Sequence, residues 1–230
     1  MKGRVPVYAG TGCVSTRDTI TLSREAERLG ADILSIITPS FAVASQQELY
    51  DHYCAVAAHV DTPIVLYNIP ARTGNKLLPE TVCRLAKDVE VIKGAKDSSG
   101  DWENLKAYIQ LTKDLDFSVL SGNDSLILPA LKEGGVGGIA GCSNVYPKVL
   151  SSIYELFKAG KLDEAQAAQN SIASFRAVFK YGNPNTVVKT AVAMLGYNVG
   201  KCRAPFNQLP QEGLEALEKV LQENKDKGMC

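Results

Sequence analysis

Residues 29–37 read Leu29-Gly30-Ala31-Asp32-Ile33-Leu34-Ser35-Ile36-Ile37, which places a glycine between a helical segment and an apolar run. Glycine is the usual residue where a helix ends in the left-handed conformation. The run after it is apolar on both faces, which is typical of a strand that is covered on both sides. A helix that leads directly into such a strand predicts parallel pairing through right-handed crossovers.

The alternation of strand and helix continues along the chain. Six strand-like runs begin near Val5, Ala31, Pro63, Val91, Phe117 and Val136. Segments with a helical period follow them, at 22–29, 46–59, 79–86, 102–111 and 126–131. Pro79 stands in a first helical turn, where its missing N–H group costs nothing. The sequence therefore predicts six βα units.

A repeat of about 30 residues per unit is typical of a TIM (β/α)8 barrel of about 250 residues. Eight units close such a barrel, so we expect the first two units to be missing from this sequence. After about Lys158 the pattern is helical alone, at 161–181, 186–195 and 211–223. The predicted organisation is an incomplete barrel that carries the active site in residues 1–158, with a C-terminal helical extension in residues 159–230. An open doubly wound sheet is the alternative, but no glycine-rich dinucleotide turn opens a helix.

The composition excludes several classes of partner. Among 230 residues, 25 basic and 25 acidic side chains give a formal net charge of zero. This balance gives no electrostatic reason to expect a nucleic acid or an anionic membrane as partner. The chain has no apolar run of the roughly 20 residues that cross a bilayer, and its first residues lack the apolar stretch of a secretory signal. We therefore expect a cytoplasmic protein.

Metal chemistry is not indicated either. The six cysteines form no Cys-x-x-Cys pair, which argues against a zinc or redox motif. The only histidines are His52 and His59, and no acidic cluster accompanies them. We expect neither a metal nor a cofactor.

Lys96 ends a predicted strand, at the position where barrel enzymes place their chemistry. Two-residue alternation puts Lys96 on the same face as Ile92 and Gly94, and Gly94 is expected to leave room beneath the lysine stem. Partial desolvation in a barrel mouth favours the neutral amine, which attacks carbonyl carbons. A lone lysine is more often a surface residue, so this prediction depends on the neighbouring side chains.

Two side chains near the end of the preceding strand support a reactive lysine. Tyr67 ends that strand, and adjacent strands lie only about 4.8 Å apart, so its phenol can relay protons to an amine at the same height. Arg72 follows in the loop, where a guanidinium can hold a carboxylate with two hydrogen bonds. A packing tyrosine and a solvated arginine are the plainer alternatives.

These stretches resemble the dihydrodipicolinate synthase and N-acetylneuraminate lyase family of pyruvate-dependent aldolases. The first motif is Tyr67-Asn68-Ile69-Pro70-Ala71-Arg72-Thr73-Gly74, and the second is Ile92-Lys93-Gly94-Ala95-Lys96-Asp97-Ser98-Ser99-Gly100. Supporting stretches are Ala9-Gly10-Thr11-Gly12, Leu120-Ser121-Gly122-Asn123-Asp124 and Gly134-Gly135-Val136-Gly137-Gly138-Ile139. The resemblance extends from about Gly3 to the C-terminal helices.

The resemblance implies a role for each candidate residue. Lys96 is expected to form the Schiff base and Tyr67 to shuttle protons. Arg72 is expected to receive the carboxylate of the second substrate. Ile139 would border bound pyruvate with its backbone, and Gly122 would line the substrate site. The implied protein is a class I aldolase without metal or cofactor, active as a homo-oligomer, a dimer or a tetramer.

Two departures from the family pattern bear on activity. The Gly-Thr-Thr-Gly-like loop of the family's first two units, which holds the pyruvate carboxylate, does not precede Val5. Dihydrodipicolinate synthases usually have two tyrosines where this chain has Ser40 and Phe41, and one of the two reaches the neighbouring subunit's site. Phe41 has no hydroxyl to relay a proton, whereas Arg72 favours the synthase branch.

The predicted function is a lyase or synthase that joins pyruvate to an aldehyde, with aspartate semialdehyde as the expected partner, as in 4-hydroxy-tetrahydrodipicolinate synthases of lysine biosynthesis. The alternatives are another 2-oxo acid aldolase, such as an N-acetylneuraminate lyase or a 2-keto-3-deoxy sugar acid aldolase, and a non-catalytic, N-terminally truncated remnant.

Overall fold

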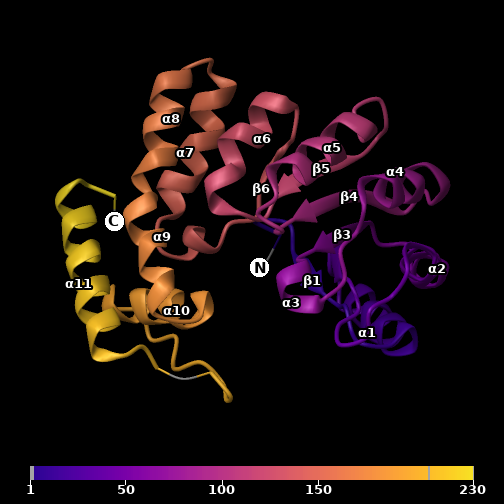
Figure 1. Ribbon diagram of the computed structural model, residues 1–230, viewed down its shortest axis with the longest axis horizontal. Coiled ribbons are helices and arrows are strands. Elements are labelled where there is room, and N and C mark those ends of the chain that lie inside the picture. Colours follow the sequence, from indigo (N-terminus) through magenta and orange to yellow (C-terminus); the bar gives the residue numbers. More distant parts are fainter. Residues whose placement is uncertain (1–2, 207, 230) are drawn as a thin grey trace. The chain divides into compact units, whose positions relative to one another are not determined.

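A parallel sheet organises the N-terminal part of the chain (Figure 1). The computed structural model describes residues 3–206 and 208–229. Within them the sheet has six strands in the order β1-β2-β3-β4-β5-β6, and every neighbouring pair is parallel. The strands are β1 (Tyr8–Gly10), β2 (Ile33–Ile37), β3 (Ile64–Asn68), β4 (Ile92–Asp97), β5 (Ser118–Ser121) and β6 (Gly137–Gly138). All six predicted strands are therefore confirmed, although β6 has only two residues.

Helices connect the strands at all five predicted segments, and the structure adds the short helix α3, which was not predicted. They are α1 (Thr16–Arg28), α2 (Gln46–Ala57), α3 (Pro70–Thr73), α4 (Pro79–Asp88), α5 (Trp102–Thr112) and α6 (Ile127–Glu133), with the 3-10 turn η1 (Asp124–Leu126) before α6. Local signals set several of these boundaries. Ser45 and Glu48 form a reciprocal capping box at the start of α2. Gly30 has φ +82° between α1 and β2, as expected for a left-handed helix end.

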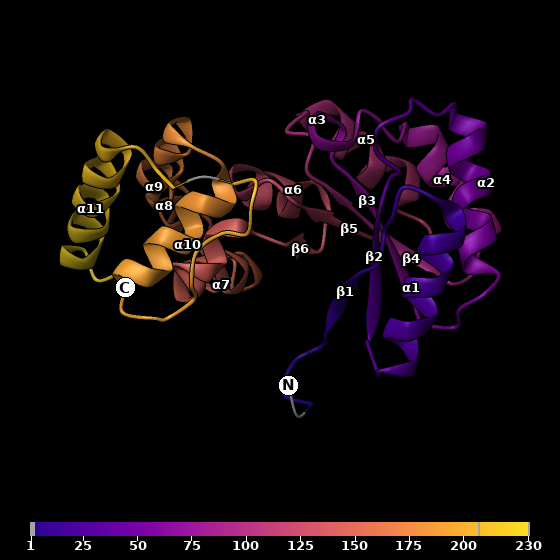
Figure 2. The same ribbon diagram turned by 90° about the horizontal axis from the view of Figure 1, so that it is seen from below.

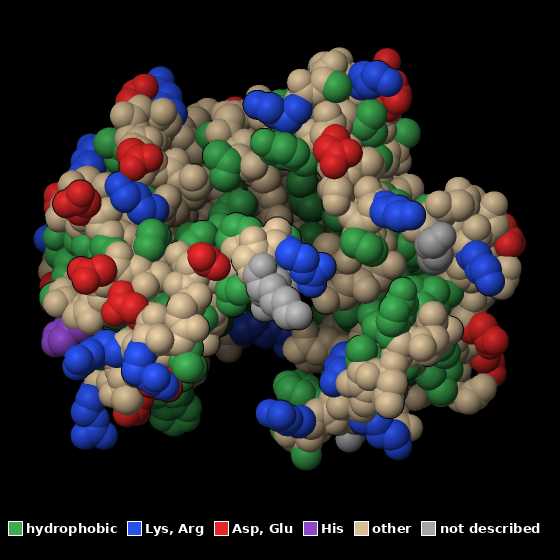
Figure 3. All heavy atoms as spheres, turned by 180° about the vertical axis from the view of Figure 1, so that it is seen from behind, with side chains coloured by type: hydrophobic (Ala, Val, Ile, Leu, Met, Phe, Trp, Pro, Cys, Tyr) green, Lys and Arg blue, Asp and Glu red, His purple; other side chains and the backbone are tan. Residues whose placement is uncertain are grey.

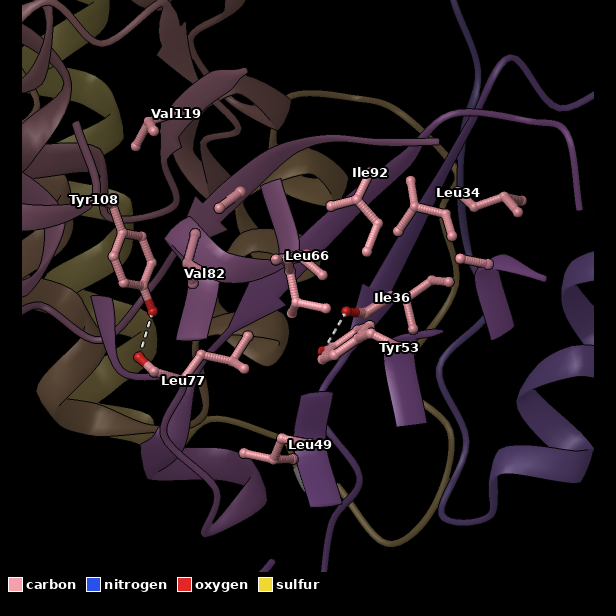
Figure 4. Packing of buried hydrophobic residues seen from close by; sticks show 14 of the residues in the cluster. Leu34, Ile36, Leu49, Tyr53, Leu66, Leu77, Val82, Ile92, Tyr108 and Val119 are labelled. Atoms are coloured by element: carbon pink, nitrogen blue, oxygen red, sulfur yellow. Dashed lines mark hydrogen bonds between the residues drawn. The ribbon is translucent and has the colours of Figure 1, made fainter. Parts of the chain in front are cut away.

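The helices cover one face of the sheet, and the main core lies between these helices and the sheet (Figure 2). Leu34, Ile36 and Leu66 project from the strands into this core and are fully buried. Tyr53 and Tyr108 enter it from α2 and α5, and their hydroxyls donate to the carbonyl oxygens of Ile36 (3.0 Å) and Leu77 (2.5 Å), as Figure 4 shows. Burying each large apolar side chain contributes about 1.5–3 kcal/mol, so this face supplies the stability of the sheet.

The opposite face carries a different set of side chains. Ser35, Ile37, Tyr67, Lys96 and Leu120 alternate with the core residues along their strands and are only half-buried. The sheet ends at β1 and β6, which pair with a single neighbour each. The described residues therefore form an open, one-sided β/α sheet. The apolar strand runs predicted a sheet that is covered on both faces. Within residues 3–138, helices cover only one face.

A β-bulge in β4 changes which side chains share a face. Ile64 pairs with Ile92, but the next residue, Val65, pairs with Gly94, so Lys93 is an extra residue without a partner in β3. An extra residue reverses the alternation beyond it. Ile92 therefore lies in the helix-covered core, whereas Gly94 and Lys96 lie on the open face. The expectation that Ile92 and Lys96 share a face was wrong for this reason.

The helices of the C-terminal part form a second compact unit. The chain divides into residues up to Gly138 and residues from Ile139 on. The second unit contains η2 (Gly141–Asn144), α7 (Pro147–Lys158), α8 (Leu162–Ser171), α9 (Ala173–Ala177), η3 (Val178–Tyr181), α10 (Pro184–Met194) and α11 (Gln211–Asp226). Its core includes an edge-to-face pair, Tyr146 and Phe175, with ring centroids 5.3 Å apart. The sequence places the division after residue 158, but α7 packs against α8, so packing assigns α7 to the second unit.

The face of the molecule shown in Figure 3 has no dominant sign of charge. Basic and acidic side chains are both spread over the face shown in Figure 3, in keeping with the formal net charge of zero. No helix in the described part of the chain is long and apolar enough to cross a bilayer.

His52 is a buried titratable group in the interface between α1 and α2. The ring is 6% exposed, and its Nδ1 atom lies 2.9 Å from the Thr16 hydroxyl. Its Nε2 atom is buried and has no hydrogen-bond partner in the described structure. A charged imidazolium would require a second acceptor there, so burial lowers the pKa of His52 below its ordinary value of 6.5.

We predict that this burial makes stability sensitive to acid. The neutral ring is favoured in the folded state, so its contribution is fully present above about pH 6.5 and is lost as the pH falls below it. Urea unfolding at pH 7.5 and pH 5.5 measures this loss. His52→Gln should show a smaller loss than the wild type, and His59→Gln, at the exposed histidine, should behave as the wild type. Equal pH dependence in all three proteins would contradict the prediction.

Candidate active site

Lys96 and Tyr67 lie side by side at the carboxyl ends of β4 and β3. The two residues are paired in the register of these strands. The Lys96 Nζ atom stands over the Tyr67 ring, 3.7 Å from its centroid. Both side chains are half-buried on the open face of the sheet. An ammonium over an aromatic face is attracted by the ring quadrupole, which holds the amine beside the phenol.

Gly122 makes room for Lys96 on the side of β5. It follows β5 directly, and its N–H donates to the Asp97 carbonyl oxygen at 2.7 Å. A Cβ atom at this position would lie 2.9 Å from Lys96 Cε and only 1.8 Å from Ser98 Oγ. Only glycine therefore fits here without displacing the lysine stem. The Ser98 hydroxyl occupies the position that a Cβ atom of residue 122 would take, and Ser98 was not among the predicted site residues.

Gly94 has a different role from the one expected. A Cβ atom at Gly94 would lie 2.6 Å from the Ser118 carbonyl oxygen in the backbone of β5. Gly94 thus permits the close approach of β4 and β5, and Gly122, not Gly94, leaves the space beside the lysine stem. The prediction for Gly94 was wrong because the neighbouring strand, not the side chain two residues on, occupies the space.

Arg72 lies in the loop that follows β3. Its helix, α3 (Pro70–Thr73), is a single turn that is capped by Gly74, where φ is +80°. The neighbouring Thr73 is buried and accepts a hydrogen bond from the Thr38 hydroxyl at 2.8 Å, which fixes this turn to the end of β2. The Arg72 side chain is exposed, and its guanidinium makes no hydrogen bond or ion pair within the described residues. It can accept a carboxylate without breaking another contact.

The loop after β2 holds Phe41 outward. Phe41 is 98% exposed and has φ +85°, a conformation that costs energy for a bulky residue. The buried Asn75 side chain fixes the loop, because its amide donates to the carbonyl oxygens of Pro39 (2.9 Å) and Ala42 (2.8 Å). Its oxygen accepts from the Ala44 N–H at 2.8 Å. The strained conformation is therefore built into the fold.

Ile139 is the remaining predicted site residue. It follows β6 and is the first residue of the second unit, where it is half-buried. The structure thus brings Lys96, Tyr67 and Gly122 together and places Arg72 in the loop after the same strand as Tyr67. Ile139 belongs to the second unit, so its role at the site stays a prediction.

A buried polar cluster, which was not predicted from the sequence, lies next to the lysine. Asp97 is 2% exposed, and its carboxylate accepts hydrogen bonds from Asn68 Nδ2 (2.7 Å) and from the Ser99 hydroxyl (2.8 Å). Burial raises the pKa of Asp97, and the hydrogen bonds from Ser99 and Asn68 oppose that rise. Asn68 and Asp97 both stand in the two motifs quoted from the sequence. Their positions directly after Tyr67 and Lys96 could have indicated that they lie beside the reactive pair.

No candidate metal centre accompanies these residues. Within residues 3–206 and 208–229, no group of three His, Cys, Asp or Glu side chains could hold a metal ion. The expectation of chemistry without metal or cofactor stays a prediction.

The fold and the site define the class of protein. It is an α/β protein whose lysine and tyrosine lie at the carboxyl ends of adjacent parallel strands, where barrel enzymes have their active sites. Comparison with known proteins gives the family. The family model described as the dihydrodipicolinate synthetase family matches residues 1–224. The chain belongs to this family.

Relatives of known name agree. The 4-hydroxy-tetrahydrodipicolinate synthase of Methanoculleus marisnigri is 41% identical over 220 residues, which are 95% of this chain and 75% of that protein. Among solved structures, dihydrodipicolinate synthase from Thermotoga maritima has a TM-score of 0.93 at 32% identity. The matched region covers 97% of this chain and 77% of the Thermotoga maritima chain. The chloride-inhibited Acinetobacter baumannii enzyme, solved with pyruvate, has a TM-score of 0.92 at 33% identity, with 100% and 77% covered.

Proposed function

We propose that this chain is a lysine-dependent synthase that condenses pyruvate with aspartate semialdehyde, as 4-hydroxy-tetrahydrodipicolinate synthases do. The observation that carries the proposal is the contact between Lys96 Nζ and the Tyr67 ring at adjacent strand ends. The names of the relatives support the reaction, and the pyruvate in the Acinetobacter baumannii structure supports the substrate.

Lys96 would carry the covalent chemistry. Its neutral amine adds to the keto carbon of pyruvate and gives a carbinolamine, which loses water to form the imine. The protonated imine draws electrons, so C3 releases a proton and an enamine forms. The enamine carbon then bonds to the aldehyde carbon, whose oxygen takes up a proton. Water hydrolyses the new imine and regenerates the amine, so the water released at the start is returned.

Tyr67 would move the protons in these steps. Its ring lies against the amine, so the phenol is close to the atoms that gain and lose protons. Arg72, exposed and without a partner among the described residues, would hold the carboxylate of the second substrate. Gly122 would line the substrate site beside Lys96, and the Ile139 backbone would border bound pyruvate, as the family resemblance implies.

A different 2-oxo acid aldolase is the second candidate. Phe41 favours it, because a phenylalanine cannot relay a proton as the tyrosine expected in synthases would. Arg72 favours the synthase. The aldehyde partner therefore separates the two candidates, whereas both require the imine at Lys96.

A closed barrel would require two further βα units between the edges β1 and β6. We propose that the sheet of this chain is a (β/α)8-type barrel that lacks these two units, since the chain spans about three quarters of the length of its relatives and its sheet is open. The roles expected for residues 1–158 and 159–230, and a cytoplasmic location, stay predictions from the sequence.

We predict that Lys96→Ala abolishes trapping of pyruvate by borohydride, because the amine that forms the imine is lost. Intact mass before and after reduction measures the adduct. Lys93→Ala is the matched control from the same strand, since Lys93 is ion-paired with Asp116 at 2.7 Å and should leave trapping unchanged. An adduct that survives Lys96→Ala would refute the assignment. A folded wild type without any adduct would mean that this chain is a non-catalytic remnant.

We predict that Tyr67→Phe slows imine turnover by about 10²–10⁴-fold, the usual contribution of a positioned proton carrier. The ring remains and can still pack against Lys96, so the loss isolates the hydroxyl. Single-turnover rates of adduct formation at saturating pyruvate give this ratio. A rate equal to that of the wild type would remove the Tyr67 hydroxyl from the mechanism.

We predict that the chain forms a homo-oligomer through the loop that presents Phe41. A strained, 98% exposed phenylalanine that a buried asparagine holds outward is well suited to a protein interface. Sedimentation velocity at micromolar concentration should show a dimer or a tetramer that Phe41→Asp weakens. Leu29→Asp, at the exposed end of α1, serves as the control. A monomeric wild type would contradict the prediction.

A further inference from the structure

Two buried polar residues stand directly behind the reactive pair. Asn68 follows Tyr67 in β3, Asp97 follows Lys96 in β4, and the two are paired at the last position of the strand register. Successive side chains of a strand point to opposite faces, so Asn68 and Asp97 lie on the helix-covered side. Their side chains are 1% and 2% exposed, and Asn68 Nδ2 donates to Asp97 Oδ1 at 2.7 Å.

The orientation of Asn68 is fixed by its second contact. Its Oδ1 atom accepts a hydrogen bond from the Leu77 N–H at 3.0 Å. A backbone N–H can only donate, so the amide nitrogen must point toward Asp97. Asn68 thus ties β3 both to β4 and to the segment that leads into α4, and it cannot rotate without leaving a buried group unpaired.

Asp97 is held as an acceptor. Its carboxylate receives the Asn68 amide, the Ser99 N–H (3.2 Å), the Ser99 hydroxyl (2.8 Å) and the Asn104 amide (3.4 Å). Its backbone carbonyl accepts from the Gly122 N–H at 2.7 Å, which links β4 to the end of β5. One residue therefore fixes the end of β4 on both sides, by its side chain toward β3 and by its backbone toward β5.

The position of Lys96 depends on this end of the strand. The bulge at Lys93 shifts the register of β3 and β4 by one residue, so the pairs beyond it, up to Asn68 and Asp97, set the height of Lys96. Between the bulge and Asp97 the strand has only three residues, Gly94, Ala95 and Lys96. A shift of one residue would turn Lys96 to the opposite face.

We propose that the hydrogen bond between Asn68 and Asp97 is a positioning device that sets the height of Lys96 against Tyr67 for catalysis. Neither residue contacts the substrate, because both point away from the open face. The inference rests on the proposed function, and it adds two positioning residues to that reaction. Its effect should appear in the limiting rate of imine formation and not in the pyruvate concentration that gives half of that rate.

Asn68→Ala in the full chain tests the proposal by single-turnover trapping of pyruvate with borohydride. We expect the limiting rate to fall by about 10–100-fold, since a displacement of about 1 Å can cost 10²-fold. The half-saturating pyruvate concentration should stay within about twofold. Asp97→Asn keeps an oxygen that accepts from Asn68 and should lose less than about threefold. If Asn68→Ala does not fold, Asn68→Ser is used, whose hydroxyl can accept from Leu77 but is too short to reach Asp97.

Tyr53→Phe is the control for a general loss of stability. It removes another buried hydrogen bond of the same core, 3.0 Å from the Tyr53 hydroxyl to the Ile36 carbonyl oxygen, and should leave the trapping rate unchanged. An Asn68 variant that traps at the wild-type rate overturns the positioning role alone. A rate that falls equally in Tyr53→Phe, at equal loss of melting temperature, overturns it as well. A wild type that traps no pyruvate overturns the proposed function, and the inference with it.

Discussion

Five residue pairs join β3 to β4, from Ile64 and Ile92 to Asn68 and Asp97, and Tyr67 with Lys96 is the pair before the last. The contact of the amine with the ring exists because two parallel strands bring residues 29 positions apart to the same height. The bulge at Lys93 determines on which face of the sheet Lys96 lies. The hydrogen bond between the Asn68 amide and the Asp97 carboxylate joins the last pair of the register. The remaining features of the site, the space at Gly122 and the loop of Arg72, are attached to these two strand ends.

One face of this sheet carries the core residues, and the other carries the candidate catalytic residues. Leu34, Ile36 and Leu66 bury their side chains under the helices, so the helix-covered face anchors the strands in the main core. The open face can therefore carry a lysine, which would be costly in the core. Stability and reactivity thus depend on alternate residues of the same strands, and Asn68 and Asp97 connect them because each adjoins one residue of the pair.

Much of the fold was predictable because its signals are local. The glycine after α1, the proline that opens α4 and the apolar runs of the strands depend only on residues a few positions apart, and the structure confirms the elements they predict. The helix α7 was missed even though Pro147 stands in its first turn, because the sequence there was assigned to the end of the barrel. The faces of β4 were predicted incorrectly, since simple alternation assumes a strand without a bulge.

The order of strands and helices, the family and the residues at the strand ends could be read from the sequence, because they follow from short-range patterns and from motifs. Which of those residues meet depends on the packing of the folded chain. The bulge at Lys93 forms through pairing with β3, Gly94 is required by the backbone of β5, and Gly122 by the stem of Lys96. Each of these constraints comes from a neighbouring strand that is distant in the chain, so no local pattern could contain it.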